Sequence, residues 1–101
     1  MSEYITVAEV SRVPAGRGLS VRIGDRAFGL FNIDGEIYAL DGECPHRGGP
    51  LGEGMTEHGH VYCPLHGWEF DVKTGECLDH PEKRAGCFPT RVVDGKVQIC
   101  V

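Results

Sequence analysis

Short runs in which apolar and polar residues alternate occupy both ends of the chain, and turn residues separate them. Alternation with a period of two is typical of β-strands that bury one face. No stretch shows the 3.6-residue period of a long amphipathic helix. The pattern predicts strands at 19–23, 27–33, 36–40, 60–62, 68–72, 76–78, 90–93 and 96–101.

Two Asp-Gly dipeptides, Asp34-Gly35 and Asp94-Gly95, each lie between two of these predicted strands. Both residue types tolerate the positive φ of a type I′ turn, so the dipeptides predict tight β-hairpins. Several short strands with turns at this spacing indicate an all-β fold, either a sandwich or a small barrel.

The middle of the chain, from 41 to 67, has a different composition. It is rich in glycine and proline, holds four of the five histidines, and contains one short strand candidate at 60–62. Such a segment buries little apolar surface by itself, and a bound metal would stabilise it. We therefore expect a single domain, residues 1–101, in which a metal-binding lobe of about 41–83 is inserted into a β scaffold.

Composition narrows the class of protein. With 101 residues, 41% hydrophobic residues and a formal charge of −5, the chain is an ordinary small acidic domain. Negative charge argues against nucleic acid as a partner. The sequence shows no secretory signal and no apolar run of about 18 residues, so we expect no membrane partner and a cytoplasmic location. Five cysteines, an odd number, argue against a complete disulfide framework.

Two close cysteine–histidine pairs stand out in the lobe. Cys44 and His46 form the first, Cys63 and His66 the second, and proline follows each cysteine. Thiolate with imidazole suits zinc or an iron–sulfur centre. Zinc would take all four ligands in one tetrahedron, whereas a two-iron cluster would place the cysteines on one iron and the histidines on the other. Because each pair mixes the two ligand types, the spacing favours the two-iron cluster.

The remaining cysteines and histidines occur singly, without a paired partner. Structural or surface roles are favoured for Cys77, Cys87, Cys100, His58, His60 and His80.

The double motif resembles that of the Rieske-type [2Fe-2S] ferredoxins. Three stretches carry the resemblance: "YALDGECPHRGGPLGEG", "VYCPLHGWEFDVKTGE" and "FPTRVVDGKV". It implies an antiparallel β-sandwich with an inserted cluster-binding lobe. It also implies one [2Fe-2S] cluster per chain, bound by Cys44, His46, Cys63 and His66. A third loop usually covers the cluster in this family, and residues 79–83 are the candidate here.

One departure from the family's high-potential branch concerns three positions. Members of that branch carry a disulfide joining the two cluster loops and a serine after the second His-Gly. The matching positions here are Gly49, Leu65 and Trp68. The resemblance therefore indicates the low-potential, ferredoxin-like branch.

A cluster whose iron ligands are all filled passes electrons but offers no position for a substrate. The resemblance thus implies an electron-transfer protein and not an enzyme, taking electrons from a flavin-dependent reductase and passing them to a terminal oxygenase. The alternative is the small subunit of an NAD(P)H-dependent nitrite reductase, whose partner is the large subunit. A structural zinc-binding module is the remote alternative.

Overall fold

The computed structural model describes residues 3–45, 48–65 and 67–101. Within these ranges the chain forms ten β-strands and two single-turn 3₁₀ segments, and no α-helix. The strands are β1 (Tyr4–Glu9), β2 (Gly18–Ile23), β3 (Arg26–Ile33), β4 (Glu36–Asp41), β5 (Met55–Glu57), β6 (His60–Tyr62), β7 (Glu69–Asp71), β8 (Cys87–Phe88), β9 (Thr90–Val93) and β10 (Lys96–Cys100). The 3₁₀ segments are η1 (Val10–Arg12) and η2 (Leu51–Glu53).

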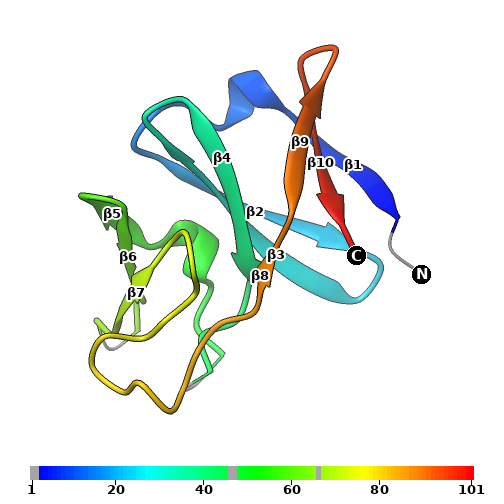
Figure 1. Cartoon of the computed structure of the whole chain (residues 1–101). Coiled ribbons are helices and arrows are strands. Elements are labelled where there is room, and N and C mark those ends of the chain that lie inside the picture. Colours follow the sequence, from blue (N-terminus) through cyan, green and yellow to red (C-terminus); the bar gives the residue numbers. More distant parts are fainter. Residues whose placement is uncertain (1–2, 46–47, 66) are drawn as a thin grey trace.

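The strands form three antiparallel sheets, in the orders β1-β10-β9, β2-β3-β4-β8 and β5-β6-β7. The first two face each other and make the scaffold, while the third lies apart from them in a lobe (Figure 1). The all-β sandwich with an inserted lobe, as predicted from the sequence, is therefore confirmed.

Both Asp-Gly hairpins are present. Asp34 and Gly35 connect β3 to β4 with φ of 53° and 91°, and Asp94 and Gly95 connect β9 to β10 with φ of 52° and 75°. Two successive positive φ values are the signature of a type I′ turn, which matches the twist of the strands it joins.

Four features differ from the predicted strands. The segment 76–78 is not a strand and pairs through the isolated bridges Phe70–Cys77 and Glu76–Arg84. Conversely, β1, β5 and β8 were not predicted. These three strands are short or lack a clean alternation, so their partners stabilise them more than their own sequence does.

Strand β3 separates two hydrophobic cores, because its buried residues point in both directions. Phe28 and Leu30 pack with Val97 and Ile99 of β10 in the core between the scaffold sheets. Phe31 belongs instead to a second core, which joins the scaffold to the lobe. The other buried members of this second core are Leu40, Cys44, Leu51, Val61, Cys63, Phe70, Val72, Cys77 and Ala85. The lobe is thus fixed to the scaffold by a dry interface, which orients its loops.

None of the helical segments in the described ranges has the length and hydrophobicity needed to cross a membrane.

Candidate metal centre

Two loops of the lobe share one hydrogen-bond pattern. In the first, the Cys44 N–H donates to the Gly49 carbonyl and the Gly48 N–H donates to the Cys44 carbonyl, both at 2.8 Å. In the second, the Cys63 N–H donates to the Trp68 carbonyl and the Gly67 N–H donates to the Cys63 carbonyl, again at 2.8 Å. Each cysteine is therefore held by its own backbone at the start of a closed turn.

Glycine is required at one matching position of each loop. Gly48 and Gly67 have φ of 72° and 74°, in the left-handed region that other residues rarely adopt. Both are the residue whose N–H bonds back to the loop cysteine. The glycines that accompany the two cysteine–histidine pairs thus permit the turns that close these loops.

The thiols of Cys44 and Cys63 lie in the interior, at 2% and 3% exposure, and both belong to the core that joins lobe and scaffold. A β-carbon built on Gly49 would stand 2.7 Å from Sγ of Cys63, too close for any real contact. The first loop therefore packs directly on the second loop's cysteine, and Gly49 leaves that sulfur space. Two buried thiols on abutting loops fit the cysteine half of a two-iron cluster site.

The other half of the predicted ligand set, His46 and His66, lies outside the described residues. Among the residues that are described, no group of three or more histidine, cysteine or acidic side chains is arranged to hold a metal ion. The ligand assignment of Cys44, His46, Cys63 and His66 therefore stays a prediction.

The remaining cysteines have separate environments. Cys77 is fully buried in the core that joins lobe and scaffold, Cys87 is exposed and its thiol contacts the Lys73 carbonyl at 3.3 Å, and Cys100 is half-buried in β10. Cys87 and Cys100 lie outside the core that holds the two motif cysteines.

The three lone histidines lie in the lobe and make different contacts. His58 is 89% exposed and lies 3.6 Å from a carboxylate oxygen of Glu57. His60 on β6 pairs with Glu69 on β7, and both side chains are half-buried. His80 stacks on the indole of Trp68. The sequence indicated surface roles for all three, but the contacts of His60 and His80 had no signal in the sequence because their partners come from other elements.

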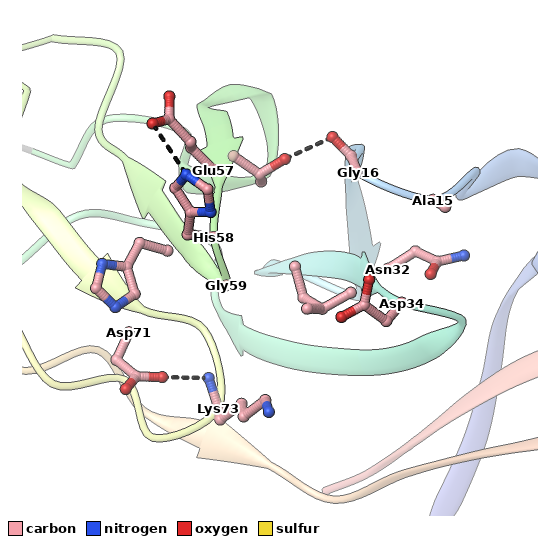
Figure 2. A pocket seen from close by; sticks show the side chains of 12 residues that line it. Ala15, Gly16, Asn32, Asp34, Glu57, His58, Gly59, Asp71 and Lys73 are labelled. Carbon is pink, nitrogen blue, oxygen red and sulfur yellow. Dashed lines mark hydrogen bonds and ion pairs between the residues drawn. The ribbon is translucent and has the colours of Figure 1, made fainter.

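A cleft of about 600 Å³ lies between the lobe and the scaffold. In Figure 2, Glu57 and His58 of the lobe lie on one side of it, and Asn32 and Asp34 of the scaffold on the other. The Lys73 N–H donates to Asp71 at 2.9 Å in the same cleft. None of the described residues of the two cysteine loops lines this cleft.

Comparison with known proteins defines the protein family of this chain. Residues 3–96 match the Rieske [2Fe-2S] domain family, and the chain belongs to that family. It is 31% identical to the ferredoxin component of the naphthalene 1,2-dioxygenase/salicylate 5-hydroxylase systems of Ralstonia sp., over 95% of this chain and 93% of that one.

Two solved structures extend the likeness to the fold. The ferredoxin of Sphingomonas yanoikuyae B1 matches with a TM-score of 0.87 at 28% identity, covering 96% of this chain and 97% of the other. A candidate NADH-dependent nitrite reductase small subunit from Mycobacterium tuberculosis matches with a TM-score of 0.88 at 26% identity, covering 100% and 96%. The chain therefore resembles ferredoxin components and nitrite reductase small subunits alike.

Proposed function

We propose that this protein is a one-electron carrier, not an enzyme in its own right, which holds one [2Fe-2S] cluster through Cys44, His46, Cys63 and His66. The observation that carries the proposal is the pair of matching loops that bury Cys44 and Cys63 in one core. In a Rieske centre two cysteines bind one iron and two histidines the other. Membership of the Rieske family supports the same ligand set.

The residues of the chain would hold the cluster and limit its chemistry. When bound, the cluster supplies reversible one-electron transfer. Water would have little access to the cysteine side of the site, because Cys44 and Cys63 are buried in a hydrophobic core. The closed turns would position both cysteines toward the iron, and metal binding would be coupled to the ordering of the site. With four protein ligands on two irons, no coordination position remains for a substrate.

As partners we infer a flavin-dependent reductase that supplies the electron and a terminal oxygenase that takes it. Support comes from the relatives, which are ferredoxin components of oxygenase systems. We further propose that residues 1–101 act as a single domain in the cytoplasm. Thiols stay reduced in the cytosol, so this location suits cysteines that bind iron.

A second candidate role is the small subunit of an NAD(P)H-dependent nitrite reductase. The likeness to the Mycobacterium tuberculosis structure over the whole chain favours it. In that role the protein would bind a large catalytic subunit instead of cycling between two separate proteins.

The experiment is a metal analysis followed by spectroscopy of the purified protein. We expect about two irons and two sulfides per chain and no stoichiometric zinc. In the reduced protein, electron spin-echo modulation should show two iron-bound nitrogen nuclei, which a four-cysteine cluster would lack. A colourless protein with one bound zinc would refute the proposal. Electron transfer to an oxygenase, or tight binding to a nitrite reductase large subunit, then separates the two roles.

A further inference from the structure

The segment that follows β7 and its turn makes two contacts with the start of β7 and one with the end of the second cysteine loop. The Leu78 N–H donates to the Glu69 carbonyl at 2.9 Å. The Glu69 N–H donates to a carboxylate oxygen of Asp79 at 2.8 Å. The imidazole of His80 stacks on the indole of Trp68, with ring centroids 4.0 Å apart and an angle of 29° between the planes. Leu78 and Asp79 are thus attached to Glu69, and His80 is attached to Trp68.

Trp68, whose indole stacks on His80, is hydrogen-bonded to the proposed cluster ligand Cys63. The Trp68 carbonyl accepts the hydrogen bond from the Cys63 N–H, and its side chain packs on the core that contains Cys63 and Cys77. A displacement of Trp68 would therefore move the hydrogen bond that fixes Cys63. His80 is thus linked to the backbone N–H of Cys63 through Trp68.

His80 also begins a tight turn. The Lys83 N–H donates to the His80 carbonyl at 2.8 Å, which closes residues 80–83. The imidazole side chain remains 44% exposed on its outer side. Its inner face is the one that meets Trp68. The ring is therefore placed to hold this turn down on the second cysteine loop.

We propose that His80 is a positioning residue, whose stack on Trp68 locks the segment 78–83 against the second cysteine loop and so limits the access of water to the cluster. This inference rests on the proposed function. The reduced cluster carries one more negative charge than the oxidised one, and water stabilises charge better than a protein interior does. Excluding water therefore disfavours reduction and lowers the midpoint potential.

The test compares three variants of the cluster-containing protein. His80→Ala removes the stack, His80→Phe keeps a flat ring without the imidazole nitrogens, and His58→Ala is the matched control. His58 is an exposed histidine of the same lobe that pairs with Glu57. The first measurement is the midpoint potential, and the second is hydrogen exchange of the Cys63 and Glu69 amides by mass spectrometry.

We expect His80→Ala to raise the midpoint potential and to speed exchange at both amides about twofold to tenfold, the range that the loss of one aromatic pair produces. His80→Phe should restore both values, and His58→Ala should change neither. Asp79→Ala, which removes the second contact and leaves the stack, should shift both measurements in the same direction as His80→Ala.

Three results would overturn the inference: His80→Ala indistinguishable from wild type, His80→Phe no better than His80→Ala, or His58→Ala equal in effect. If His80→Ala speeds amide exchange without changing the midpoint potential, His80 has only a structural role. A wild-type protein without an iron–sulfur cluster would refute the proposed function instead. The exchange comparison would still report on the stack in that case.

Discussion

Gly49 and Leu65 lie against each other across the two cysteine loops. A β-carbon built on Gly49 would be 3.0 Å from Cγ of Leu65. In the high-potential branch of the Rieske family these two positions hold a disulfide, and here neither residue can form one. Rieske centres span about −150 to +300 mV. We expect a midpoint at the lower end of that range, and a redox titration giving a value well above zero would contradict this.

The same glycine leads to a prediction about cluster assembly. An alanine at position 49 would place its β-carbon 2.7 Å from the Cys63 sulfur, so thiol or loop would have to move. We expect Gly49→Ala to hold less iron and sulfide than the wild type but not to lose the cluster altogether, because the high-potential branch accommodates a cysteine β-carbon at this position. Leu65→Ala is the control, because it shortens a side chain that is 53% exposed. Equal iron content in the two variants would show that the first cysteine loop shifts to accommodate the added β-carbon at little energetic cost.

Alanine variants of the cysteines outside the motif should change at most the stability of the protein, without changing its metal content. Cys77 is fully buried beside the core of the lobe, so Cys77→Ala should cost about 1 to 2 kcal/mol of unfolding free energy. Cys87→Ala should change stability little, because Cys87 is exposed. Both variants should keep the full cluster content, whereas alanine at Cys44, His46, Cys63 or His66 should abolish it. If Cys77→Ala or Cys87→Ala loses its colour, the ligand set is wrong.

The lobe carries the negative charge of the protein. Residues 41–83 include nine acidic and three basic side chains, while the rest of the chain has six acidic and seven basic ones. We therefore expect electron transfer from the reduced protein to a cationic acceptor, ferric cytochrome c, to slow as salt is added. With the anionic acceptor ferricyanide, the same salt should speed the reaction.

Charge reversal locates this effect on the lobe. Glu57 has a side chain 61% exposed in the lobe, and Glu3 is exposed next to β1 on the scaffold. Glu57→Lys and Glu3→Lys change the net charge equally, but the first should slow the reaction with cytochrome c more. Equal slowing would mean that only the net charge of the protein matters.

Tyr38 should titrate late in alkali. Its pKa is raised above 10, first by partial burial, then by the hydrogen bond to Glu36 and by the negative charges of Glu36 and Asp34. Since the folded state retains the phenol proton longer than the unfolded chain, this contribution to stability is present below about pH 10 and is lost as pH rises through the raised pKa.

Glu36→Gln should lower that pKa, because it removes a negative charge beside the phenol. Absorbance at alkaline pH measures the titration, and subtraction of the Tyr38→Phe spectrum identifies the signal of this residue. Glu9→Gln, on the other scaffold sheet, is the matched control and should leave the titration unchanged. A Tyr38 pKa that Glu36→Gln does not lower would assign the shift to burial and to the charge of Asp34 instead.

Much of the scaffold could be predicted from sequence, because local chemistry specifies it. The Asp34-Gly35 and Asp94-Gly95 turns have the backbone angles that their residue types favour, and the strands on both sides alternate as one buried face requires. The two cysteine–histidine pairs predict a metal centre, because thiolate and imidazole at short spacing suit few other roles, and that assignment stays a prediction.

The contacts between distant segments were decided only in the folded chain. Strand β1 exists because Tyr4–Glu9 pairs with Lys96–Cys100 at the other end of the sequence. The stack of His80 on Trp68 and the approach of Gly49 to Leu65 likewise join residues from different loops. Amino-acid sequence determined the turns and the strands with strong alternation, since these depend on near neighbours, and it supplied the prediction of the four ligands. Tertiary structure decided the weak strands and the environment of the cysteines, since these depend on which surfaces the packed cores bring together.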